Sequence, residues 1–193
     1  METAPATLTE TIAYLAPESE LEMQFLHDPD FYQGLFWGIP RFGHPEGKVV
    51  FHIREVLDNI DKLTLSPLQR KQLRIVTFVH DTFKYREHRG TPRDWTQHHA
   101  VLAKQFLEKY TQDQLLLDLT EFHDDAYYIW RTRFLAQNQA KSEQLLERFY
   151  QQFASSMQLY YLFFKCDTCT GDKNLAPLKW FESTIEGIEI VKL

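Results

Sequence analysis

Apolar residues recur every three or four positions along most of this chain, while glycine and proline are confined to a few short stretches. The segment over 49–63 is typical, because this spacing gathers its apolar side chains on one face of a helix. Those positions are Val49, Ile53, Val56, Leu57 and Ile60. The pattern predicts an all-α chain folded as a single-domain helical bundle with five or more core helices.

Capping residues and loops set the expected bounds of the helices. Ser66 and Pro67 are typical of a helix start. A later helix can be capped by either Asp94 or Thr96, and the helix after it by either Thr111 or Asp113. The expected helices cover about 7–16, 18–27, 49–63, 66–85, 94–110, 111–122, 127–134 and 141–165, with a short helix and an extended end in the tail. The segment 27–48 is expected to be an aromatic-rich loop packed onto the domain.

Composition narrows the class of protein. The chain has 193 residues, which fits one domain over 1–193, and its net charge of -6 argues against general nucleic-acid binding. No apolar run is long enough for a membrane span, and the first residues lack the pattern of a signal peptide. Two cysteines form no disulfide framework. We therefore expect a cytoplasmic protein. A homodimer is one of its expected oligomeric states.

The dipeptide His80-Asp81 follows the apolar run from Ile75 to Val79, which should carry both side chains into a buried place. A buried aspartate is costly unless it is paired or binds a cation. An imidazole nitrogen beside a carboxylate oxygen suits Mn, Fe, Zn or Mg better than a metal that prefers thiolates. The dipeptide therefore predicts a metal site that needs further ligands.

Further candidate ligands lie on other predicted helices. His52 lies on the helix before the dipeptide, His99 opens the helix after it, His123 closes the following one, and Asp167 ends the long helix. Helical bundles build internal metal sites in this way, with ligands from separate helices facing one another.

This pattern resembles the HD-domain superfamily of metal-dependent phosphohydrolases over about residues 43–171. The family signature is a histidine, a later His-Asp pair and a distant aspartate, here in "VVFHIREVL", "VHDTFK" and "FFKCDTCTGD". The stretches "GHPEGKVVFHIREVLD" and "HHAVLAKQFL" also resemble the HD domain attached to some tRNA nucleotidyltransferases. The resemblance implies an HD-type bundle, with residues 1–48 packed on it.

The resemblance also implies a ligand set. One metal would be held by His52, His80, Asp81 and Asp167. A second would be held by His99 and His123, with Asp81 as the bridge. His98 competes with His99 for its position, and Asp124 or Asp125 could serve in place of His123.

The expected activity is hydrolysis of a phosphoester in a small phosphorylated substrate, with a nucleotide as one candidate, by metal-activated water. One or two divalent ions among Mn, Fe, Co, Ni, Zn and Mg would serve as cofactor. A mixed-valent di-iron oxygenase of the same superfamily and a non-catalytic metal- or nucleotide-binding domain are the alternatives. A nucleic-acid substrate is not expected.

Lys84 is the expected cation of the site. It follows His80 by four residues and Asp81 by three, so the three share a helix face, and its ammonium could stabilise charge on phosphate oxygens. Asp81 and Lys84 are therefore the candidate catalytic residues. The candidates for further phosphate contacts are Arg86, Arg89, Arg93 and His44.

Overall fold

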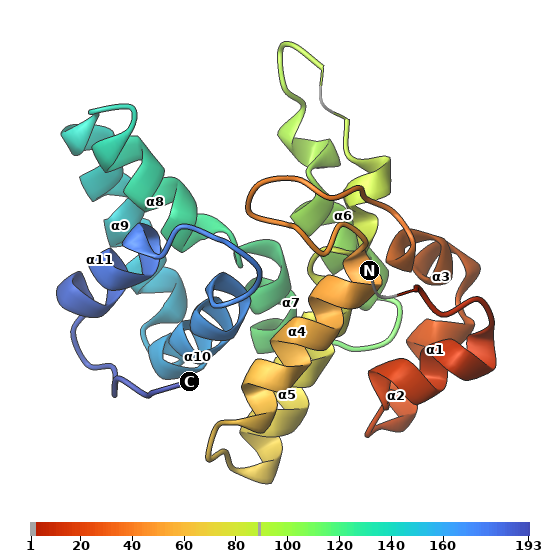
Figure 1. Cartoon of the computed structure of the whole chain (residues 1–193). Coiled ribbons are helices and arrows are strands. Elements are labelled where there is room, and N and C mark those ends of the chain that lie inside the picture. Colours follow the sequence, from red (N-terminus) through yellow and green to blue (C-terminus); the bar gives the residue numbers. More distant parts are fainter. Residues whose placement is uncertain (1–2, 89) are drawn as a thin grey trace.

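The computed structural model describes residues 3–88 and 90–193, and every regular element among them is helical (Figure 1). The α-helices are α1 (Leu8–Leu15), α2 (Glu20–His27), α3 (Pro29–Leu35), α4 (Val49–Asp61), α5 (Pro67–Val79), α6 (His99–Leu107), α7 (Gln114–Glu121), α8 (Asp125–Phe134), α9 (Gln139–Phe153), α10 (Met157–Thr168) and α11 (Ala176–Thr184). Two short 3-10 helices, η1 (Thr82–Arg86) and η2 (Trp95–Gln97), complete the set. The prediction of an all-α fold is confirmed.

The antiparallel pair α4 and α5 forms the centre of the molecule, and α10 packs against both. The helices α1–α3 cover one side of this centre, while α8, α9 and α11 form a second group on the other side (Figure 1). One hydrophobic core runs through both groups, from Leu15 in α1 to Ile185 after α11. The ends of α4, α5, α6, α7 and α10 consequently meet near the middle of the fold.

The segment 27–48 was predicted as a loop, and this is wrong for its first part. Asp28 accepts hydrogen bonds from the backbone of Asp30 and Phe31, and Pro29 occupies the first turn, so α3 begins here. Phe31 is fully buried, as expected of a segment that packs down. Phe42 is not, because 82% of it is exposed.

The helix that begins at Pro67 ends at Val79 rather than near residue 85. The chain then tightens into η1, in which residues three apart eclipse one another. Thr82 donates its hydroxyl to the Phe78 carbonyl at 2.6 Å, and its own carbonyl lies where a Cβ on Gly34 would be only 1.9 Å away. Only glycine therefore allows α3 to approach η1 this closely.

The predicted helix over 141–165 is two helices, α9 and α10, separated by a turn at residues 154–156. The turn lets α9 pack on α8 while α10 crosses to α4 and α5. It also brings the rings of Phe153 and Tyr160 to 4.6 Å, which residues seven apart on one straight helix could not reach. Tertiary packing thus overrides a continuous helical pattern.

A buried ion pair ties the N-terminal helices to the centre. Arg74 in α5 and Glu22 in α2 are almost wholly buried, and the Arg74 Nε lies 2.9 Å from the Glu22 carboxylate. Arg74 also donates to the carbonyl of Ala16, which ends α1 in the left-handed region with φ 46°. One side chain therefore fixes the positions of α1 and α2 together.

Within the described residues, every helix is too short or too polar to cross a bilayer.

Candidate metal centre

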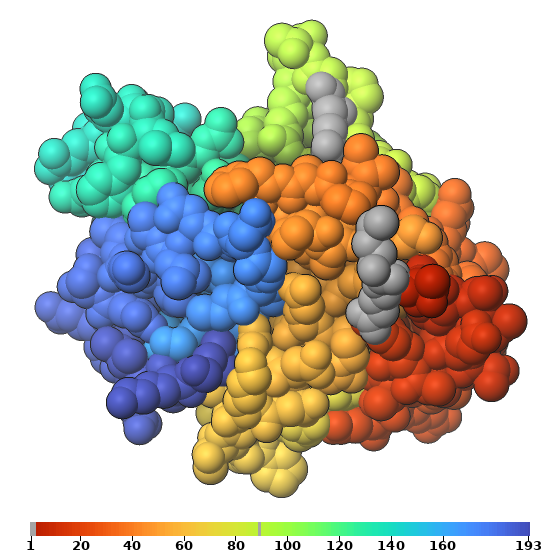
Figure 2. Space-filling model, viewed as in Figure 1, coloured from red at the N-terminus to blue at the C-terminus, as the bar shows by residue number. Residues whose placement is uncertain are grey.

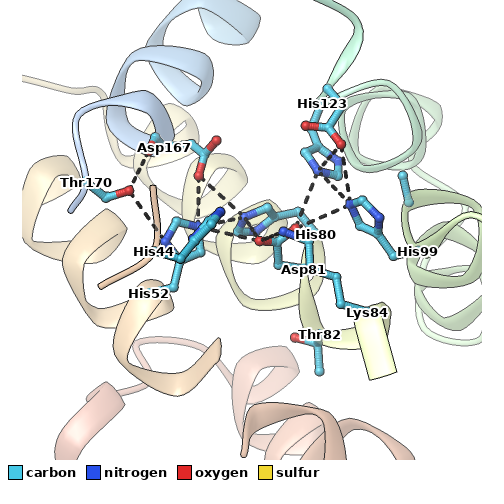
Figure 3. Close-up of polar contacts among 12 residues, drawn as sticks. His44, His52, His80, Asp81, Thr82, Lys84, His99, His123, Asp167 and Thr170 are labelled. Atoms are coloured by element: carbon cyan, nitrogen blue, oxygen red, sulfur yellow. Dashed lines mark hydrogen bonds and ion pairs between the residues drawn. The ribbon is translucent and has the colours of Figure 1, made fainter. Parts of the chain in front are cut away.

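Six predicted ligands from five helices converge on one buried place (Figure 3). His52 lies in the first turn of α4, and His80 and Asp81 directly follow α5. The other three are His99 at the start of α6, His123 just after α7 and Asp167 near the end of α10. The helix ends meet here, so residues more than a hundred positions apart come together.

The first group contains His52, His80, Asp81 and Asp167. The Nε2 atoms of His52 and His80 are 3.4 Å apart, and each is 3.7 Å from Oδ2 of Asp81. Oδ1 of Asp167 lies 2.9 Å from the His52 Nε2 and 3.8 Å from the His80 Nε2. Two imidazole nitrogens and two carboxylate oxygens thus face one small volume.

The second group contains His99 and His123. Their Nε2 atoms are also 3.4 Å apart, and they lie 3.4 Å and 3.7 Å from Oδ1 of Asp81. Asp81 therefore turns one carboxylate oxygen toward each pair of histidines. Buried histidine and carboxylate groups in this arrangement could hold a divalent metal ion in either group.

The other ring nitrogens of these histidines face acceptors. Nδ1 of His80 donates to the Thr77 carbonyl at 2.9 Å, and Nδ1 of His123 donates to the Thr120 carbonyl at 2.8 Å. A proton on Nδ1 leaves the lone pair on Nε2, where a metal ligand needs it. In the neutral rings, these two carbonyls thus select the tautomer whose unprotonated nitrogen points into the site.

The carboxylates of the site are held ionised by nearby lysine ammonium groups and by contacts with histidine rings. Burial by itself would raise the pKa of Asp81, but Lys84 and His80 outweigh it and keep that pKa well below its usual range. At Asp167, burial is outweighed by Lys173 and His52, with the same result for the pKa. Lys84 forms an ion pair with Oδ2 of Asp81, and the Lys173 Nζ lies 2.8 Å from Oδ1 of Asp167.

His52 and His123 differ in how readily they take up protons. Burial and the Lys173 ammonium lower the pKa of His52 to about 4 despite the nearby Asp167 carboxylate. At His123, burial opposes protonation, but Asp124 and Asp81 outweigh it and raise its pKa to about 9. His52 is therefore neutral at pH 7, as a metal ligand must be, whereas a metal ion at His123 has to displace a proton.

A pocket of about 340 Å³ opens onto the site. One part of its wall is polar, with Asp81, Lys84, Asp124 and Lys173, and another is apolar, with Phe42, Tyr127, Phe164 and Pro177. The loop over 38–47 borders the segment after α10 on this face, and the Gly43 backbone donates to Asp172 at 2.6 Å (Figure 2). The contact between these two segments forms one rim of the pocket.

His98 and His99 differ in orientation. His98 caps α6, accepting from the Ala100 backbone through Nδ1, and its Nε2 lies 3.1 Å from the Tyr128 hydroxyl. His99 faces His123 and Asp81. Asp124 lies beside His123 instead of replacing it, with Oδ2 3.7 Å from the His123 Nε2. Asp125 begins α8, and burial raises its pKa to about 7.

The structure separates the phosphate-binding candidates. His44 lines the pocket and lies 2.9 Å from Glu46 through Nδ1. Arg93 pairs with Glu87 in a neighbouring hollow that also contains Lys84 and His99. Arg86 is half exposed and pairs with Asp30 away from the site. Arg89 lies outside the described residues.

Sequence reasoning missed Lys173, which pairs with Asp167 and lines the pocket. A lysine six residues after a predicted ligand was the signal available, but it needs the turn after α10 to become a site residue. It also missed Glu46 and Glu87, whose carboxylates lie 3.5 Å from Nδ1 of His52 and His99 respectively.

Tyr160 supports the turn that carries His123. Its hydroxyl donates to the Phe122 and His123 carbonyls at 3.1 Å and 2.9 Å, and accepts from the Ala126 backbone.

We expect Tyr160→Phe to reduce the free energy of unfolding by about 1–3 kcal/mol, because buried backbone groups lose their partner. Urea unfolding measures this. Tyr150→Phe is the control, because the Tyr150 hydroxyl donates to the Thr184 carbonyl over a long distance, 3.5 Å. Equal losses in both variants would contradict the prediction.

Comparison with protein-family models, with curated proteins and with solved structures finds no match for this chain.

Proposed function

We propose that this protein is a metal-dependent phosphohydrolase of the HD superfamily that acts on a small phosphorylated substrate. The observation that carries the proposal is the Asp81 carboxylate, shared between two pairs of histidines at the wall of a pocket that also presents Lys84. The order and types of these residues are those of the family signature. No other cluster in the described chain combines this many ligands with an open pocket.

The residues fit divalent ions. His52, His80, Asp81 and Asp167 would hold one ion, and His99, His123 and Asp81 a second. When bound, such ions lower the pKa of water and polarise a phosphoryl oxygen. Imidazole and carboxylate ligands accept Mn, Fe, Co, Ni, Zn and, with more oxygen ligands, Mg.

The chain itself supplies cations for the phosphate. Lys84 and Lys173 both line the pocket, from the Asp81 side and the Asp167 side. An ammonium beside the position where charge develops stabilises the transition state most where water is excluded. The apolar wall at Phe42, Tyr127 and Phe164 would receive the remainder of a small substrate. With a net charge of -6, the chain offers little general affinity for a nucleic-acid backbone.

The test is phosphate release by purified protein that has been stripped of metal and reloaded separately with Mn, Co, Ni or Mg. The substrates are a panel of phosphomonoesters, phosphodiesters and nucleotides. We expect release from at least one of them, and none without metal. No release at full metal occupancy from any substrate would overturn the proposal.

Lys84→Ala tests the role of the lysine. We expect kcat to fall roughly 100- to 1000-fold, as it does in other enzymes when one preorganised hydrogen-bond donor to the transition state is removed. The metal content should not change. The matched control is Lys71→Ala, because Lys71 is exposed on α5 away from the pocket. A Lys84→Ala enzyme that turns over at the wild-type rate would remove Lys84 from the mechanism.

A di-iron oxygenase is the second candidate function. The observation in its favour is that each group combines two histidines with a carboxylate, the ligand set of many non-haem iron oxygenases. Anaerobic loading with Fe(II), followed by oxygen and spectroscopy, tests it. Protein that binds one ion per chain, or two irons that stay inert to oxygen with every organic substrate tried, would exclude this function. Bound metal with no turnover in either assay would indicate a binding domain.

A further inference from the structure

The metal centre is built from two similar halves. The pattern Thr-x-x-His-Asp occurs at Thr77–Asp81 and again at Thr120–Asp124. Each copy ends the second helix of a pair, α4 and α5 in the first case and α6 and α7 in the second. The first helix of each pair carries the other histidine of the group near its start, His52 or His99.

The two copies have matching local geometry. The hydroxyls of Thr77 and Thr120 each donate to the carbonyl four residues earlier, at 2.8 Å in both cases. The carbonyls of the same threonines accept from Nδ1 of the histidine three residues later, at 2.9 Å and 2.8 Å. In both groups the two Nε2 atoms are 3.4 Å apart. The resemblance between the halves therefore extends from sequence to ligand positions.

The outer histidines have matching partners as well. Oε1 of Glu46 lies 3.5 Å from Nδ1 of His52, and Oε1 of Glu87 lies 3.5 Å from Nδ1 of His99. Both glutamate side chains are about 95% buried. A buried carboxylate facing Nδ1 fixes the ring and leaves Nε2 free for a metal.

The aspartates of the two copies occupy different positions. Asp81 lies between the groups and faces both. Asp124 lies at the outer side of the second group, with Oδ2 3.5 Å from the His99 Nε2 and 3.7 Å from the His123 Nε2. In the first group this outer position is filled by Asp167, which comes from α10.

We propose that Asp124 is the terminal carboxylate ligand of the second metal position and the counterpart of Asp167. Glu46 and Glu87 are then positioning residues, one for each metal. The inference rests on the proposed metal centre but not on the reaction. Each position has two histidines, one terminal aspartate and one oxygen of Asp81. The three carboxylate ligands would offset three of the four positive charges of two divalent ions.

Mn(II) binding tests this inference without any activity assay. Free Mn(II) is followed by electron paramagnetic resonance, and we expect two ions per wild-type chain. In a His52→Ala background the remaining ion reports on the second position. There, Asp124→Asn should weaken binding at least 10-fold, whereas Asp167→Asn should change it less than threefold. In a His99→Ala background the two effects should exchange.

The matched control is Asp125→Asn, which changes the neighbouring carboxylate and should leave both affinities within threefold. Circular dichroism of the metal-free variants establishes that each is folded. Wild-type affinity for the second ion in Asp124→Asn would overturn the proposal. A wild-type chain that binds one ion would also overturn it, whereas a one-metal hydrolase would still release phosphate.

Glu46→Gln and Glu87→Gln test the positioning residues. We expect each to weaken the ion of its own half about 10-fold, within the range known for residues that orient metal-bound histidines. The other ion should keep its affinity, a split that general destabilisation would not produce. Equal weakening of both ions by each variant would contradict the assignment.

Discussion

Asp81→Ala is expected to remove metal from both positions at once, because Asp81 presents one oxygen to each pair of histidines. Elemental analysis of the purified variant should find less than a tenth of the wild-type metal. Stabilisation by bound metal should disappear as well. For an ion at 1000 times its dissociation constant that stabilisation is about 4 kcal/mol. Addition of a chelator should therefore lower the Tm of the wild-type protein and leave that of Asp81→Ala unchanged.

Asp58→Ala is the control for this experiment. Asp58 lies on the outer face of α4, where it pairs with Arg54 and 59% of its side chain is exposed. Its removal should change neither metal content nor the response to chelator. Wild-type metal content in Asp81→Ala would show that the histidines bind without a shared carboxylate, and would contradict the two-group arrangement.

Arg74→Ala is expected to destabilise the fold by about 3–5 kcal/mol, the usual cost of leaving one member of a buried ion pair without its partner. Glu22 is 1% exposed and would keep an uncompensated charge, while the Ala16 carbonyl would lose a donor. Chemical unfolding followed by circular dichroism measures the change. Because both contacts lie on α1 and α2, we expect these helices to loosen first.

Arg70→Ala is the matched control, one turn earlier on the same helix. Arg70 pairs with Glu18 and Asp61, but the side chains are 33–44% exposed, so the loss should be below about 1 kcal/mol. A similar loss in both variants would contradict the distinction between the buried and exposed pairs. Replacing both Arg74 and Glu22 with apolar residues should recover part of the stability, since no buried charge is then left alone.

Periodicity and caps were sufficient for most of the helices. Ser66 caps α5 as predicted, and Asp113 rather than Thr111 caps α7. The prediction that Asp94 or Thr96 caps the helix over 94–110 is wrong, because α6 begins at His99 and is capped by His98. The errors in the predicted helix bounds arise where packing between residues distant in the sequence determines where a helix ends. The turn between α9 and α10 depends on the contact of Phe153 with Tyr160, and the end of α5 depends on the close approach of α3. Neither cause can be read from a local window of sequence.

In the candidate site, too, some residues could be predicted from the sequence and others depend on tertiary packing. Residue types and order were enough to predict that four of the ligands share one site, and the structure places them together: His52, His80, Asp81 and Asp167. The role of Asp124 depends on the side from which it approaches His99, and that of Lys173 depends on the turn after α10. From the sequence, Asp124 was a candidate only in place of His123, and Lys173 was not a candidate at all.

Asp167 follows every predicted histidine ligand of the site in the sequence, since these histidines lie between residues 52 and 123. During synthesis, the second half of the site can therefore be complete once α7 and Asp124 have left the ribosome. The first half must wait for α10. In the proposed centre, the second group could therefore bind metal before the first, whose set of ligands is complete only after α10 has been synthesised.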